Sequence, residues 1–185
     1  MPDFYDVISL VTAYSKPSMQ LFLEIEYKKR HFEYYDSNEA KWLNAHWDDG
    51  VRDIFEENFV NREDTYCISE YSRVTQNIAE GLVEVQFTLR CGEAEESISA
   101  TGNGILSAVA SGLQKSALVP AFMLEDYSEH TMGKDENATA LAFVGIRLAE
   151  SKKLVYGAGS HPDIARTAVA ALVSALNCAA ANGGK

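Results

Sequence analysis

The chain repeats one short pattern: extended residues, a glycine-x-glycine turn and the start of an apolar helix. The first copy is Ser97–Lys115, which contains Gly102-Asn103-Gly104, and the second is Leu154–Ile164, which contains Gly157-Ala158-Gly159. Glycine has no Cβ, so it can adopt positive φ and let another backbone or a ligand approach closely. Two strand-turn-helix units in one chain of 185 residues predict a duplicated fold.

Each helix that follows such a turn begins with backbone N–H groups that have no partner within the helix. These groups and the positive end of the helix dipole favour an anion, such as a carboxylate or a phosphate. Glycines at a strand-to-helix turn more often serve chain geometry alone. Because the pattern occurs twice, however, the two helix starts could lie side by side across a pseudo-twofold axis.

Hydrophobic periodicity divides the chain into three regions. Residues 1–35 form an N-terminal extension with a strand-like alternation at Leu21–Tyr27. Residues 36–64 carry an apolar stripe at helical spacing, which predicts a small helical linker subdomain. Residues 65–182 predict two β-β-β-α units, 65–117 and 118–182. The expected fold class is α+β, with duplicated β-β-β-α units related by pseudo-twofold symmetry and preceded by the linker.

The pattern also predicts individual strands and helices. In the first unit we expect strands at 66–71, 82–89 and 95–101, followed by a helix from Ile105. In the second unit we expect strands at 121–125, 140–148 and 153–156, with an irregular polar segment at 126–137. We expect Ser160 or His161 to cap the last helix, with Pro162 at its first position.

Composition excludes several functional classes. The net charge of −11 argues against a nucleic-acid partner, because binding to phosphate backbones depends on clustered Lys and Arg. The three cysteines are widely separated and form neither a disulfide framework nor a zinc pattern. The N-terminus lacks the features of a secretory signal, and no apolar run approaches the ~18 residues of a membrane span. We therefore expect a cytoplasmic protein with no membrane partner.

The candidate catalytic patterns are weak. Gly102-x-Gly104-x-x-Ser107 lacks the third glycine of a dinucleotide fingerprint, and the strands around it read as an antiparallel meander. The four histidines show no metal-binding spacing, and no nucleophile elbow occurs. We predict no catalytic residues, no metal site and no cofactor, and a nucleotide-binding domain stays a minor alternative.

One group of motifs resembles a known family. The run Asp126–His130 is followed by Met132-Gly133 and Ala138, with the Gly102 turn before it and the segment from Gly157 to Asn177 after it. This order resembles the C-terminal regulatory domain of 2-isopropylmalate synthase over about residues 40–178. The resemblance implies a homodimer of duplicated β-β-β-α units that binds leucine, the pathway end product, near the subunit interface and inhibits a distant catalytic barrel.

The resemblance also assigns ligand-binding roles by position. The turn would contact the amino acid, and Ser107 would follow one helical turn later. A second group would line the pocket for the side chain, and a third would close the site from the second turn. The turn residues are Gly102, Asn103 and Gly104. The pocket residues are Leu124, Tyr127, Thr131 and Ala138, and the residues that close the site are Ser160 and Pro162.

Two substitutions leave the identity of the ligand open. The family usually has Pro after the Gly-Asn-Gly turn and Ala two residues later, where this chain has Ile105 and Ser107. Isoleucine, the effector of the similar citramalate synthase domain, is one alternative, and a structural dimerisation module with a degenerate pocket is another. A (β/α)₈ barrel needs about 250 residues, so we expect this chain to act on a separate catalytic synthase chain.

Overall fold

A computed structural model describes residues 59–77, 81–132 and 139–181. The described residues contain eight helices and strands in the order β-β-β-α-β-β-β-α. The first unit comprises β1 (Tyr66–Asn77), β2 (Leu82–Cys91), β3 (Ala94–Gly102) and α4 (Ile105–Leu113), and the second comprises β4 (Phe122–Met132), β5 (Thr139–Leu148), β6 (Leu154–His161) and α5 (Ile164–Ala181). The predicted duplication of β-β-β-α units is confirmed. The predicted extension at 1–35 and residues 36–58 of the predicted linker (36–64) lie outside the described residues.

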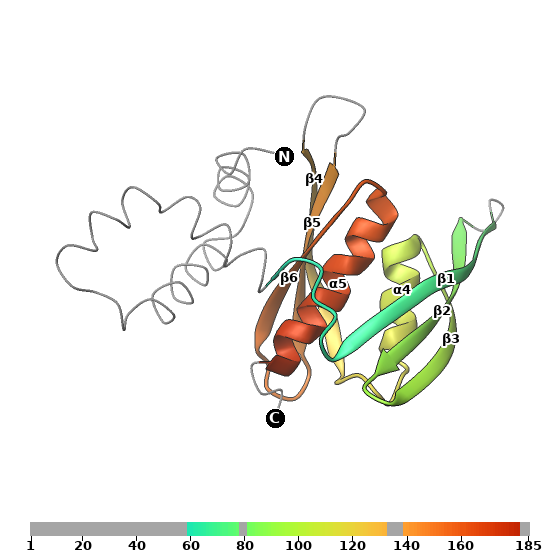
Figure 1. Cartoon of the computed structure of the whole chain (residues 1–185). Helices are drawn as coiled ribbons and strands as arrows, with labels where there is room; N and C mark the ends of the chain where they lie inside the picture. The colour runs from blue at the N-terminus through green and yellow to red at the C-terminus, as the bar shows by residue number, and fades with distance from the viewer. Residues whose placement is uncertain (1–58, 78–80, 133–138, 182–185) are drawn as a thin grey trace, which may run out of the picture.

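Each unit is a three-stranded antiparallel meander with one helix on one face. The strand orders are β1-β2-β3 and β4-β5-β6. Helix α4 packs on β3 and β2, α5 packs on β6 and β5, and the two helices contact each other. The helices therefore lie between the two sheets, and both begin at the end of the molecule where β3 and β6 finish (Figure 1).

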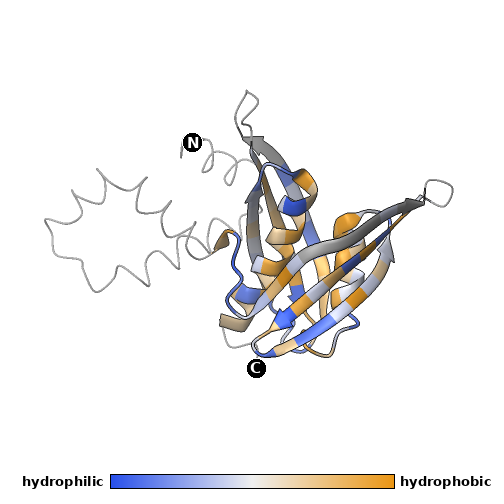
Figure 2. Cartoon of the chain, turned by 45° about the vertical axis from the view of Figure 1, so that its right-hand side comes forward, coloured by the Kyte–Doolittle hydropathy of each residue, from blue (hydrophilic) through white to orange (hydrophobic). Residues whose placement is uncertain are grey.

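Alternation along the strands explains why one face of the first sheet is covered. In β2, Val85, Phe87 and Leu89 are buried, while the residues between them are polar and more exposed. Figure 2 shows the same alternation of apolar and polar bands along this sheet. The apolar side meets Val109 and Leu113 of α4, which are also fully buried. The packed face is thus set by the period-two pattern of the strands.

The second Gly-x-Gly motif is part of a strand, so the prediction of a turn at Gly157–Gly159 is wrong. A Cβ on Gly157 would lie 2.1 Å from the backbone nitrogen of Ala175, and one on Gly159 would lie 2.2 Å from the carbonyl oxygen of Thr167. The glycines therefore let α5 lie directly on β6. Among the described residues, the glycines with positive φ are Gly81 and Gly92, which belong to neither motif.

The segment 126–137, expected to be irregular, continues β4 as far as Met132. The strand pairs with β5 through a bulge between Leu124 and Asp126, and strand β1 has a similar irregularity between Ser69 and Arg73. Polar residues obscured this strand, because β4 lies at the edge of its sheet and exposes much of its length.

The prediction that no apolar run approaches the length of a membrane span is wrong for helix α5. It reaches 18 residues with a mean hydropathy of 1.5, which is enough to cross a membrane by length and composition alone. However, 67% of this helix is buried inside the protein. Its position between β6 and α4 is that of a core helix.

Candidate ligand site

The start of helix α4 is open. Strand β3 ends at Gly102, and Gly104 occupies the N-cap position with extended φ and ψ of −172° and 173°. Among the residues that the structure describes, no side chain caps this end, and the first turn of the helix contains no acidic residue. The first intrahelical bond runs from Ala108 N to Gly104 O at 2.9 Å. The backbone donors of the preceding residues can therefore receive an anion.

The start of helix α5 is closed by the chain itself. The Asp163 carboxylate accepts hydrogen bonds from Ala165 N at 2.8 Å and Arg166 N at 3.3 Å, and His161 Nδ1 accepts one from Asp163 N at 2.8 Å. The prediction that Ser160 or His161 caps this helix, with Pro162 at its first position, is wrong. The cap lies at Asp163 because strand β6 continues to His161.

The two strand-to-helix junctions correspond residue by residue. Each N-cap directly precedes its helix, and each strand ends two residues before its cap. The first junction has uncharged residues at the positions where the second has an imidazole, a proline ring, a carboxylate and a guanidinium. The corresponding pairs are Gly102 with His161, Asn103 with Pro162, Gly104 with Asp163, and Ser107 with Arg166.

Two of the predicted pocket residues lie on one face of β4. Leu124 pairs with Ile146 and Tyr127 with Val144, so both side chains lie on the face of the sheet that carries α5. Helix α5 covers β5 and β6, and Leu124 and Tyr127 remain 37% and 42% exposed. This edge of the sheet is therefore an accessible apolar surface. The side chain of Thr131 and residue Ala138 lie outside the described part.

The Tyr127 hydroxyl donates a hydrogen bond to Glu129. The pKa of Tyr127 is raised well above its ordinary value, chiefly by desolvation and further by the bond to the Glu129 carboxylate and by its charge. The phenol therefore stays protonated, and keeps its bond to Glu129, to a higher pH than an ordinary tyrosine would.

The predicted residues of the second junction make different contacts. Ser160 N donates to Asn61 Oδ1 at 2.9 Å, and Asn61 Nδ2 donates to Ser160 O at 3.0 Å. Pro162 is exposed. The structure thus brings Gly102, Asn103, Gly104 and Ser107 together at one junction, and it places Ser160 and Pro162 at the other.

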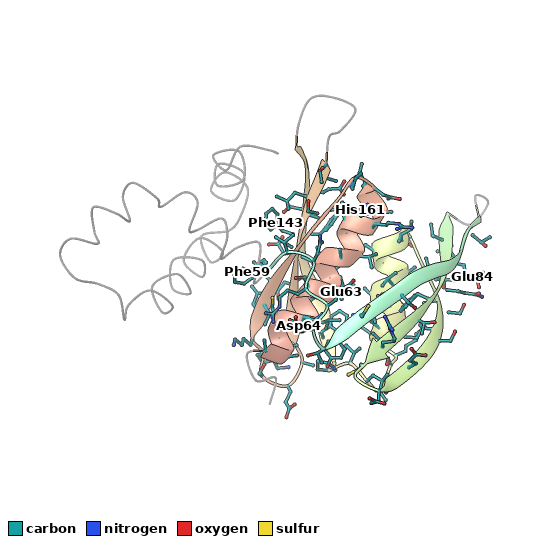
Figure 3. The ribbon with its side chains drawn as sticks, in the orientation of Figure 1. Phe59, Glu63, Asp64, Glu84, Phe143 and His161 are labelled. Atoms are coloured by element: carbon teal, nitrogen blue, oxygen red, sulfur yellow. The ribbon has the colours of Figure 1, made fainter. Side chains whose placement is uncertain are left out.

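A cleft of about 320 Å³ opens beside the second junction. It lies between the segment that precedes β1, strand β1, the end of β6 and the face of α5 that carries Arg166, Val169 and Val173. Glu63 and His161, which contribute to it, both lie over α5 in the view of Figure 3. Its lining comprises Asn61, Glu63, Ile68, Ser69, Ser160, His161, Arg166, Val169, Ala170 and Val173.

Of the predicted ligand residues, this cleft contains Ser160 alone. The other lining residues could not be predicted from the sequence, because they come from four separate segments. One signal was available: Arg166 places a positive charge in the first turn of a helix, where the dipole disfavours it. This unfavourable charge indicates that Arg166 has another role.

Comparison with known proteins agrees with this architecture. Residues 47–180 match the family model of the LeuA allosteric (dimerisation) domain. A 2-isopropylmalate synthase from Helicobacter hepaticus is 30% identical over 159 residues, which is 80% of this chain and 27% of that protein. Synthases of the same name from Mycobacterium ulcerans and Pseudomonas fluorescens are 35% and 34% identical over 52% and 57% of this chain, and over 16% and 18% of their own lengths. The chain therefore matches only about a quarter or less of each relative.

Proposed function

Because the chain belongs to the family of LeuA allosteric (dimerisation) domains, we propose that it is an amino-acid-binding regulatory domain. Its ligand is leucine or a related branched-chain amino acid, and it serves feedback control of leucine biosynthesis. The single observation that carries this proposal is the contrast between the two helix starts. One is filled by the chain's own Asp163 carboxylate, and the other has no cap.

The open start of α4 suits the carboxylate of a free amino acid. The N–H groups after Gly104 donate to it, and the helix dipole stabilises its charge. Asn103, which is exposed, offers an amide oxygen to the ammonium group. Gly102 is required for packing, since a Cβ there would lie 2.5 Å from Ala108 N. Ser107 lies in the first turn of the helix.

The apolar part of the ligand needs a separate surface. Leu124 and Tyr127 supply it from the exposed face of β4. Thr131 and Ala138 extend this surface in the proposal, and Ser160 and Pro162 bound it from the second junction. A small apolar pocket with a few polar groups is the usual form of a metabolite site.

The domain acts as a homodimer and controls a synthase catalytic barrel, either on a separate chain or elsewhere on its own. Its place is the cytoplasm, in agreement with three cysteines that form no disulfide. Turnover of acetyl-CoA and 2-oxoisovalerate by this chain alone would contradict the regulatory role.

Calorimetric titration with leucine, isoleucine and valine tests the proposal. Gly104→Asp imitates the cap of α5, and the position has room, since nothing lies within 4 Å of an added Cβ. The new carboxylate occupies the helix start, so we expect binding to weaken at least tenfold, or about 1.4 kcal/mol. Gly104→Asn is the matched control, because it caps the helix without a charge. Unchanged affinity in Gly104→Asp would place the ligand elsewhere.

A structural dimerisation module is the alternative, and the exposed apolar residues of β4 favour it. Met123 is 62% exposed, next to the partly exposed Leu124. Such residues also suit a subunit interface without a ligand. A wild-type chain that dimerises but binds none of the three amino acids would support this alternative.

A further inference from the structure

We propose that the cleft between α5, β6 and β1 is a second ligand site, which takes a small zwitterion with a short aliphatic side chain. The two sites share Ser160 of the second junction, but this cleft does not include the open start of α4 and does not depend on a ligand binding there. Its volume of about 320 Å³ lies at the lower end of the range of roughly 300–1,000 Å³ typical of ligand pockets. A cleft of this size favours a metabolite over a peptide or a dinucleotide.

The lining carries both charges that a zwitterion needs. Arg166 is exposed, and its guanidinium makes no ion pair within residues 59–77, 81–132 and 139–181. It can therefore receive a carboxylate with paired donors. Glu63 contributes a carboxylate to the same cleft and accepts a hydrogen bond from the Cys67 thiol at 3.5 Å. Its remaining acceptor positions suit an ammonium group.

The cleft also has an apolar wall. Val169 and Val173 of α5 are almost fully buried, and Ile68 of β1 is partly buried. All three line the cleft. Burial of a few methyl groups on this wall favours an aliphatic side chain over a polar one.

Because the fold is duplicated, this cleft is the counterpart in the second unit of the first site. Ile68 and Leu124 occupy the same position in β1 and β4, each shortly before the irregularity in its strand. The far ends of the helices also correspond. Asn177 of α5 bonds to the backbone of Tyr66 at the start of β1, and Gln114 of α4 bonds to Phe122 O at the start of β4. Each helix therefore runs from its own junction to the first strand of the other unit.

The two junctions supply positive charge in different ways. At α4 the helix start itself is free, whereas at α5 the Asp163 carboxylate occupies it. Arg166 stands where the first unit has Ser107, and it restores a positive group beside the capped helix. In the second site the Arg166 side chain therefore supplies the positive charge that the backbone N–H groups of the helix start supply in the first site.

The test uses the Gly104→Asp chain, in which the first site is closed, and titrates it with leucine, isoleucine and valine by calorimetry. We expect one of them to bind, and we expect Arg166→Gln in that background to weaken binding at least about tenfold. Lys153→Gln, which removes an exposed positive charge outside the cleft, is the control and leaves the affinity unchanged. A Glu63→Gln variant is expected to lower affinity for the amino acid but not for 4-methylpentanoate, which has no ammonium group.

The outcomes separate the two proposals. Equal binding by the wild-type and Gly104→Asp chains, lost in Arg166→Gln, supports the second site and contradicts the first. Absence of binding in Gly104→Asp at millimolar ligand overturns the second site. Binding that survives Arg166→Gln unchanged also overturns it. Circular dichroism of each variant confirms that it is folded.

Discussion

The buried amide of Asn177 joins α5 to the start of the first unit. Its Oδ1 accepts hydrogen bonds from Thr65 N at 2.6 Å and Tyr66 N at 2.9 Å, and its Nδ2 donates to Arg62 O at 2.9 Å and Tyr66 O at 2.8 Å. The residue is only 1% exposed. One side chain therefore satisfies several backbone groups that are cut off from water.

Asn177→Ala should destabilise the protein by about 3 kcal/mol or more, because it leaves buried N–H and C=O groups without partners. Asn61→Ala is the comparison. Asn61 also bonds to backbone groups, but it is exposed, and water can replace its bonds. We expect about 1 kcal/mol for that variant. Urea unfolding measures both, and equal losses would contradict this role of Asn177.

Tyr127 and Glu129 give a prediction for alkaline pH. The pKa of Tyr127 is higher in the folded chain than its ordinary value of about 10, mainly through desolvation and then through Glu129. Its contribution to stability is therefore complete below pH about 10 and declines as the pH rises further. Glu129→Gln should lower the pKa of Tyr127, as followed by the ¹³Cζ NMR shift, with Tyr127→Phe to assign the signal. Glu93→Gln in the exposed β2–β3 turn is the control and should have no effect.

At the scale of elements, the contact between α5 and β6 depends on glycine. The second Gly-x-Gly motif was expected to form a turn like the first, since the two share a sequence pattern. What differs is the helix: α5 crosses β6 so closely that Gly157 and Gly159 must lie inside the strand. The glycine pattern indicates that another group approaches the backbone closely at these positions. It does not show whether that group is a ligand or a helix.

Gly157→Ala should therefore cost about 3 kcal/mol or more, at the upper limit of overpacking effects, because the new methyl group would overlap the backbone of Ala175. Gly104→Ala is the matched substitution at an open position and should cost no more than about 1 kcal/mol, through the weaker N-cap alone. Thermal unfolding distinguishes the two. A smaller effect at Gly157 than at Gly104 would show that α5 can move away from the sheet.

At the scale of the whole molecule, period-two alternation was enough to predict two β-β-β-α units. The Gly-x-Gly pattern predicted the junction at Gly102–Gly104, where the helix begins at Ile105 as expected. It could not predict the closed start of α5, because Asp163 becomes a cap only when β6 extends to His161. Sequence patterns also could not predict the cleft. Its charged residues Glu63 and Arg166 are far apart in the chain and line the same cavity only because of long-range packing.

The links between the units predict that they unfold together. Helix α4 contacts α5, Gln114 Nε2 donates to Phe122 O at 3.2 Å, and α5 also contacts β1. Leu113→Ala in α4 removes a fully buried side chain and should cost about 2–5 kcal/mol. Hydrogen exchange should then accelerate by a similar factor in β2 of the first unit and β5 of the second. The exposed Thr101→Ala is the control. If β5 kept its full protection while β2 lost it, the units would be independent, and a ligand bound at one junction could not stabilise the other through the fold.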